Sequence, residues 1–157
     1  MSKPSKTVAS SQVIMTQLVL PSHTNAIGSV FGGTIMSWID IAAAVCAQRH
    51  SGKEVVTASI DRIDFVAPVY KGWVVNLKAS VNFTSRTSME VGVRVDAENP
   101  KNGETFHTAT AYTTFVALGS NGKPIEVPGL ELITDEDKRR FQQAAHRREV
   151  RLAEKRK

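Results

Sequence analysis

Asp40 is the one charged side chain in an apolar run from Thr34 to Gln48, and glycines precede this run at Gly28, Gly32 and Gly33. A run that is apolar almost all round predicts a helix inside the protein, where a carboxylate is costly unless it is paired, hydrogen-bonded or used in chemistry. Free N–H groups at a helix start can stabilise a developing oxyanion, and a carboxylate in a partly dry site can act as general base on water. The pattern therefore points to hydrolysis of an activated acyl group.

Two plainer interpretations stay open on spacing alone: Gly32 and Gly33 could serve close packing of the helix on a sheet, and Asp40 could be a hydrogen-bonded core acid. Seven residues of helix rise about 10 Å, whereas a base and an oxyanion donor must each lie within about 3 Å of the atoms they serve. Gly33 and Asp40 of one chain cannot easily meet at one carbonyl group. A second chain with an antiparallel helix would bring its Asp40 beside Gly33, so the sequence predicts an obligate dimer.

Motifs for other kinds of catalysis are absent from the sequence. It contains no G-x-S-x-G nucleophile elbow, no H-E-x-x-H zinc motif, no Walker loop and no G-x-G-x-x-G. The four histidines are scattered through the chain, and a lone cysteine in an apolar helix, here Cys46, is typical of a small core residue. We therefore expect neither covalent catalysis nor a cysteine-based metal cluster.

The composition is that of one soluble globular domain, with 157 residues of which 41% are hydrophobic. The net charge is +5, but residues 134 to 157 hold nine Lys/Arg and five Asp/Glu, so 9 − 5 = +4 of it lies in the tail. The nearly neutral body argues against a nucleic-acid partner. A single cysteine, no apolar run of about 20 residues and a polar start without a signal-peptide core predict a cytoplasmic protein without a membrane partner.

The elements that must position Asp40 follow from hydrophobic periodicity and turn residues. We expect a disordered polar leader at residues 1–10, a domain at residues 11–120, and an extended arm with a charged helix at residues 121–157. Thr134 and Asp137 form a capping-box pattern at the start of that helix. The predicted strands cover residues 12–20, 55–66, 72–84, 88–98 and 104–118. These elements predict an α+β fold in which one curved antiparallel sheet wraps one helix.

Four segments, in order, carry a resemblance to a known family: LPSHTNAIGSVFGGTIMSWIDIAAAVCAQRHSG, VVTASIDRIDFVAPVYKGWVV, SRTSMEVGVRV and ATAYTTFVAL. Together they resemble the hot-dog-fold acyl-CoA thioesterases of the cytosolic acyl-CoA hydrolase family, over about Leu18 to Leu118. The tail AAHRREVRLAEKRK is similar to the segment that follows the hot-dog domain in some members. The chain has one hot-dog domain where animal members have two in tandem, so a homodimer is the natural equivalent.

The resemblance implies a five-stranded sheet around the helix, homodimers, and commonly a hexamer built as a trimer of dimers. It implies hydrolysis of acyl-CoA to a free fatty acid and CoA without metal or organic cofactor. A loop Asn and a helix acid from opposite subunits form the family's catalytic pair and correspond to Asn25 and Asp40. The acid would activate water, Asn25 would position the water or the thioester, and the Gly33 N–H would polarise the carbonyl. Without the resemblance, Asn25 would be interpreted as a turn residue.

The resemblance also places the CoA contacts on the strand after the helix and on the R-T-S-M turn, at Ala58, Ser59, Ile60, Thr87, Ser88 and Met89. Arg147 or Arg148 of the tail could pair with the CoA phosphates, since guanidinium suits them; a solvated charged helix is the alternative. Apolar residues that could line an acyl tunnel are Ile27, Phe31, Met36 and Phe65.

Two other functions use the same fold. A hot-dog hydratase or dehydratase uses a His with an acid, and here His23 precedes the helix but without their H-F-P or hydratase-type loop. A non-enzymatic acyl-CoA sensor would leave Asp40 without a task, and no DNA-binding module precedes the fold in this sequence. The thioesterase interpretation therefore stands first.

Overall fold

The computed structural model describes residues 3–156. Its strands and helices are, in chain order, β1 (Ser5–Thr7), β2 (Val13–Leu18), a short 3-10 helix η1 (Pro21–His23), α1 (Gly32–Ser51), β3 (Glu54–Ile60), β4 (Val74–Thr84), β5 (Ser88–Asn99), β6 (Glu104–Leu118), β7 (Gly129–Glu131) and α2 (Asp135–Lys155). No helix among these residues is both long and apolar enough to cross a membrane.

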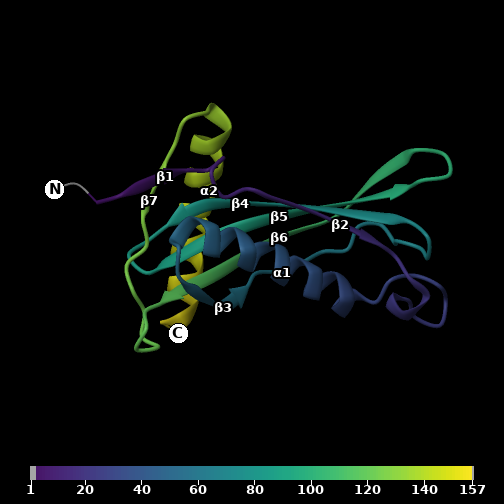
Figure 1. Cartoon of the computed structure of the whole chain (residues 1–157), viewed down its shortest axis with the longest axis horizontal. Coiled ribbons are helices and arrows are strands. Elements are labelled where there is room, and N and C mark those ends of the chain that lie inside the picture. Colours follow the sequence, from purple (N-terminus) through teal and green to yellow (C-terminus); the bar gives the residue numbers. More distant parts are fainter. Residues whose placement is uncertain (1–2, 157) are drawn as a thin grey trace.

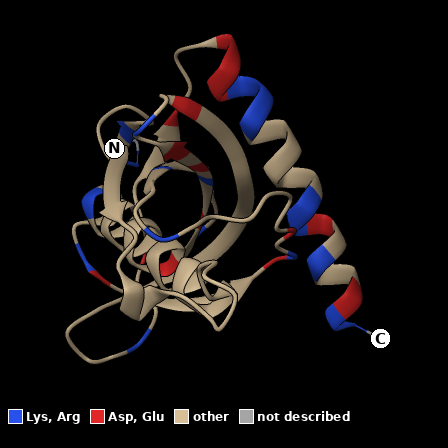
Figure 2. Ribbon diagram, turned by 90° about the vertical axis from the view of Figure 1, so that its right-hand side faces the viewer, with Lys and Arg blue, Asp and Glu red and all other residues tan. Residues whose placement is uncertain are grey.

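One antiparallel sheet with the strand order β2-β4-β5-β6-β3 curls around α1, which confirms the predicted hot-dog architecture (Figures 1 and 2). Alternate residues of the long strands β4, β5 and β6 are fully buried against α1, because successive side chains of a strand point to opposite faces. Ile39, Ala42 and Cys46 of α1 meet this face and have no exposed surface. The small alanines let the helix lie close to the sheet.

Helix α1 is longer than the predicted run and is buried on one side only. It ends at Gly52, whose φ of 67° gives the left-handed cap and whose N–H donates to the Gln48 carbonyl at 2.7 Å. On the other side, Met36 and Ile41 are 40% and 50% exposed. An apolar helix face left open in a single chain is consistent with the expected second subunit.

Strand β3 ends earlier than predicted, at Ile60 rather than Val66. The Asp61 N–H still donates to the Tyr112 carbonyl and the Val66 N–H to the Thr108 carbonyl, but the chain between them leaves the ladder. Its charged pair, Arg62 and Asp64, lies exposed. Alternation continues into this stretch, so the pattern alone could not reveal the end of pairing.

The predicted disordered leader differs from the structure over Ser5–Thr7. This strand pairs in parallel with β7, and the Lys6 ammonium donates to the Arg49 carbonyl at 3.2 Å. Met1 and Ser2 lie outside the described residues. The segment Ser5–Thr7 is too short and polar to show a strand periodicity. Its strand structure depends on pairing with β7, which is far away in the sequence.

Helix α2 lies outside the curled sheet, across its convex face (Figure 2). Its predicted capping box is confirmed, because the Asp137 N–H donates to Thr134 Oγ1 at 3.0 Å and the Thr134 N–H to Asp137 Oδ2 at 3.2 Å. Among its described residues only Ala144 is fully buried. Polar contacts must therefore contribute strongly to its docking.

Candidate active site

Asp40 lies at the middle of α1, half-buried, on the side of the helix that the sheet leaves open. Its Oδ1 accepts a hydrogen bond of 2.7 Å from the Thr57 hydroxyl of β3. Because β3 is an edge strand of the sheet, this pair lies at an uncovered border. A charge-assisted hydrogen bond from a strand fixes the direction of the carboxylate, and residues 3–156 offer no hydrogen-bond partner to its second oxygen. Thr57 was not predicted, since a Thr within a β-branched strand gives no separate signal.

Helix α1 begins with Gly32 and Gly33, so the predicted glycine-rich start of the helix is confirmed. Gly33 is the second residue of the helix, is exposed, and has open space where a Cβ would stand. N–H groups of a first helical turn lack carbonyl partners within the helix, so they are available to an incoming carbonyl oxygen. Gly32 is less open, because a Cβ there would meet the Phe65 ring at 3.6 Å.

Asn25 organises the loop before α1. Its Oδ1 accepts from the N–H groups of Ile27 and Ser29 at 3.0 and 3.2 Å, and its Nδ2 donates to Ser29 Oγ at 2.9 Å. Within the described chain, no hydrogen bond joins Asn25 or Gly33 to Asp40. One chain therefore does not assemble the three predicted catalytic residues, as expected for a site between subunits.

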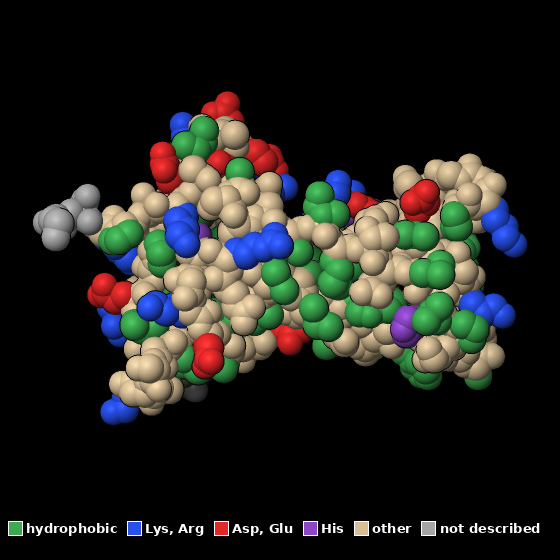
Figure 3. All heavy atoms as spheres, viewed as in Figure 1, with side chains coloured by type: hydrophobic (Ala, Val, Ile, Leu, Met, Phe, Trp, Pro, Cys, Tyr) green, Lys and Arg blue, Asp and Glu red, His purple; other side chains and the backbone are tan. Residues whose placement is uncertain are grey.

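Apolar side chains surround the helix entry. The four residues predicted to line an acyl tunnel, Ile27, Phe31, Met36 and Phe65, are all between 40% and 83% exposed. Figure 3 shows hydrophobic side chains gathered over this half of the molecule, where α1 lies in Figure 1. This surface could hold an acyl chain or a second subunit, and in a shared site it would serve both.

A cavity of about 530 Å³ lies between the second half of α2 and the convex face of the sheet. Five of the predicted CoA-binding residues line it: Ala58, Ser59, Thr87, Ser88 and Arg148. The register of β3 shifts between Thr57 and Ser59, so Ala58 is an extra residue in the strand. Such a bulge re-aims side chains. Here it leaves Thr57 facing α1 while both Ala58 and Ser59 face the cavity.

Three predicted CoA contacts lie elsewhere. Met89 is fully buried in the core, and Ile60, the last residue of β3, is not among the cavity's lining residues. The Arg147 guanidinium donates to the Glu90 carboxylate from Nε at 2.9 Å and from Nη2 at 2.8 Å. Burial lowers the pKa of Arg147, but its bonds to Glu90 outweigh burial and raise that pKa above its ordinary value. Arg147 is thus an internal ion-pair residue.

A larger cavity of about 640 Å³ lies under the first half of α2. Of the residues predicted for catalysis or CoA binding, it contains only Arg147. Size alone therefore does not identify the site, and the chemistry of the lining favours the smaller cavity.

The other chemically active side chains are tied into the fold. Burial raises the pKa of the Cys46 thiol to about 11, so a nucleophilic thiolate is disfavoured there. His23 Nδ1 accepts from the Leu20 N–H at 3.0 Å, and its ring packs edge-on against Trp38. Among residues 3–156, no cluster of three or more His, Cys, Asp or Glu could hold a metal ion.

Comparison with known proteins agrees with this geometry. Residues 27–104 match the model of the thioesterase superfamily. The chain is 43% identical over 127 residues to an uncharacterized acyl-CoA thioester hydrolase of Bacillus subtilis, covering 81% of this chain and 74% of that protein. It is 38% identical to the cytosolic acyl coenzyme A thioester hydrolase of Rattus norvegicus over 90% of this chain, which spans 38% of the rat protein.

Solved structures give the same answer. An apo-hexameric acyl-CoA thioesterase superposes with a TM-score of 0.93 at 42% identity, covering 96% of this chain and 97% of that one. An acyl-CoA hydrolase of Staphylococcus aureus, in complex with butyryl-CoA, CoA and CoA disulfide, gives a TM-score of 0.90 at 38% identity over 97% and 93% of the two chains. Variants of that enzyme with an Asp, a Thr or an Asn replaced by Ala have also been solved. The chain belongs to the thioesterase superfamily and, within it, to the hot-dog acyl-CoA thioesterases.

Proposed function

We propose that this protein hydrolyses acyl-CoA to a free fatty acid and CoA at a site shared between two subunits. The observation that carries the proposal is the 2.7 Å bond by which Thr57 orients the Asp40 carboxylate on the open side of α1. Asp40 takes a proton from water, the resulting hydroxide attacks the thioester carbonyl, and the C–S bond breaks as the leaving thiolate gains a proton. The Gly33 N–H stabilises the oxyanion, and Asn25 positions the loop and the thioester. The proposed reaction uses water, the Asp40 and Asn25 side chains and one backbone N–H group, without metal or organic cofactor.

The spacing of the substituted residues in the S. aureus enzyme supports these roles. Its altered Asn, Asp and Thr stand 15 and 17 residues apart, as do Asn25, Asp40 and Thr57 in this chain. The proposal places the coenzyme in the cavity lined by Ala58, Ser59, Thr87 and Ser88, which lies across the edge strand from Asp40. The hexameric relative supports a trimer of such dimers.

A complementation experiment tests whether the site is shared. Asp40→Asn and Asn25→Ala are each expected to abolish most release of free thiol from acyl-CoA. In a mixed dimer of the two variants, a shared arrangement leaves one site with an intact Asn25 and an intact Asp40. Random mixing of subunits should therefore recover about a quarter of the wild-type rate, because half of the dimers are mixed and each carries one of two sites.

The outcome separates the alternatives. If Asn25 and Asp40 act within one chain, every site of the mixed dimer is defective and the mixture stays inactive. Wild-type protein that releases no thiol from any acyl-CoA would refute hydrolysis altogether and favour a sensor. Unchanged thioester with a shifted double bond would favour a hydratase. Against a hydratase stands the sequence around His23, which lacks the H-F-P or hydratase-type loop.

A further inference from the structure

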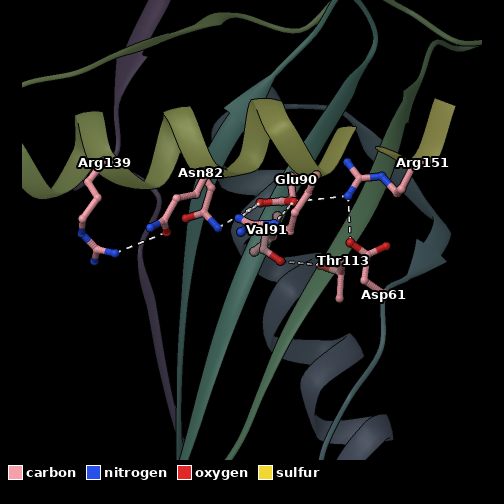
Figure 4. A network of polar contacts seen from close by, with 9 residues as sticks. Asp61, Asn82, Glu90, Val91, Thr113, Arg139 and Arg151 are labelled. Carbon is pink, nitrogen blue, oxygen red and sulfur yellow. Dashed lines mark hydrogen bonds and ion pairs between the residues drawn. The ribbon is translucent and has the colours of Figure 1, made fainter. Parts of the chain in front are cut away.

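Glu90 is the most deeply buried carboxylate among the described residues, and it lies beneath α2 on β5. Its side chain is 1% exposed, and it accepts from Asn82 Nδ2 at 3.1 Å, from Arg147 at 2.8 and 2.9 Å, and from Arg151 Nη1 at 3.4 Å (Figure 4). A buried carboxylate is strongly unfavourable without such partners. Two of the three partners come from α2, so Glu90 and this helix depend on each other.

The two arginines stand one helical turn apart and face the sheet together. Arg147 lies over the Tyr112 ring, with the guanidinium carbon 3.6 Å from the ring centroid. Arg151 Nη1 also donates to Asp61 Oδ2 at 2.8 Å (Figure 4). Asp61 directly follows β3, the strand that carries Thr57, Ala58 and Ser59. The network therefore fixes α2 to the middle of the sheet and to the end of the edge strand.

This docking decides which cations face the coenzyme cavity. Arg148 and Lys155 line it from α2 and form no ion pair among residues 3–156. Three carboxylates also line it, Asp61, Glu90 and Glu154, and their charges would repel phosphate. Arg147 and Arg151 neutralise Asp61 and Glu90, which leaves Glu154 at the C-terminal end of α2 as the one lining carboxylate without an ion pair among residues 3–156. The cavity therefore presents Arg148 and Lys155 as its unpaired cations.

We propose that Glu90 is a positioning residue for the coenzyme: by holding Arg147 and Arg151 it fixes α2 so that Arg148 and Lys155 can bind the phosphorylated end of CoA. The inference rests on the proposed function. Glu90, Arg147 and Arg151 together form a clamp that holds α2 on the sheet. Phosphate recognition is left to Arg148 and Lys155. The acyl end of the substrate lies on the other side of the edge strand, so its binding and hydrolysis should not depend on the clamp.

The test is the Glu90→Gln variant, assayed with two thioesters of the same acyl group: the CoA ester, and the pantetheine ester, which lacks the phosphorylated nucleotide. Loss of the charge-assisted contacts should raise KM for acyl-CoA about tenfold with little change in kcat. KM and kcat for acyl-pantetheine should stay at wild-type values. The sign is diagnostic, because removing a negative charge without moving α2 would strengthen phosphate binding and lower KM.

Arg147→Lys is the second variant, since it keeps the charge but loses the two parallel bonds to Glu90. It should raise KM for acyl-CoA in the same selective way, and α2 amides should exchange hydrogen faster in both variants. Arg140→Lys is the matched control, because Arg140 pairs with Glu136 within α2 and does not line the coenzyme cavity. Its replacement should leave KM and kcat unchanged for both thioesters.

The KM values for the two thioesters decide whether Glu90 positions α2 for the coenzyme. A selective rise in KM for acyl-CoA, with faster exchange in α2, supports the proposal. An unchanged or lowered KM, or an equal loss with both thioesters, overturns it. If Glu90→Gln does not fold, Arg147→Lys alone decides by the same criterion. Wild-type protein inactive on both thioesters would instead refute the proposed hydrolysis, and calorimetric binding of CoA to wild type and Arg147→Lys would then still test the clamp.

Discussion

Replacing Thr57 by Val removes one hydroxyl at nearly constant volume and tests how Asp40 is held. The bond it removes is 2.7 Å long and charge-assisted. A hydrogen bond to a charged group contributes about 1.5–3 kcal/mol. If that energy holds the carboxylate where the attacking water needs it, then at about 1.4 kcal/mol per tenfold in rate kcat should fall roughly 10- to 100-fold. KM should change little, because the hydroxyl contacts the carboxylate and not the coenzyme.

The assay is thiol trapping with a saturating acyl-CoA, on protein whose oligomeric state matches wild type. Thr57→Ser keeps the hydroxyl and should retain most of the activity. Thr57 is exposed in the single chain, where water can replace the lost hydroxyl, so the variant should lose no more stability than the bond contributes, about 1.5–3 kcal/mol, and should still fold. A folded Thr57→Val protein as fast as wild type would refute the assigned role of this bond.

Three further predictions concern stability. Burial lowers the pKa of His50 although its bond to the Pro128 carbonyl opposes this, so below about pH 6.5 the unfolded chain binds a proton at His50 more readily than the folded chain. The urea concentration at the midpoint of unfolding should therefore fall between pH 7.5 and 5.5. A His50→Gln variant whose midpoint falls equally with pH would contradict this prediction. Thr134→Ala should cost about 1 kcal/mol of helix stability and speed exchange in the first turn of α2. In Gly92→Ala the new Cβ would stand 2.5 Å from Asn82 Nδ2, so a loss of about 1–3 kcal/mol is expected in thermal unfolding, and an unchanged melting temperature would show that Asn82 yields freely.

The long elements of the fold were predictable because each repeats one pattern over many residues. Strand β6 begins and ends at the predicted residues, and the α2 cap is the predicted pair. The β1 and β7 pairing was not predictable, because three-residue strands carry no periodicity and their partners stand more than a hundred positions apart. The early end of β3 was not predicted for a different reason: the alternation of apolar and polar residues continues beyond Ile60, where the ladder of hydrogen bonds to β6 ends.

Candidates for the proposed site were predictable where a residue is unusual in its surroundings. Asp40 stands out in an apolar run, and Asn25 gained its meaning only from the family resemblance. Glu90 was missed because it occupies a polar position of an alternating strand, where a carboxylate normally faces water. The sequence could not show that α2 covers this position. The signal that could have suggested a buried partner is the pair Arg147 and Arg151, which stand four residues apart and therefore on one face of α2.

Ala58 is an extra residue in β3, so Thr57 lies opposite Phe115 and Ser59 lies opposite Thr114. Thr57 and Ser59 therefore face opposite sides of the sheet although they stand two positions apart. If all three residues were paired in a regular strand, Ser59 would turn to the same face as Thr57, and the cavity outside the sheet would lose one of its walls. Removing Ala58 would instead keep both pairings. Loss of this alanine should therefore straighten the strand without exchanging its two faces.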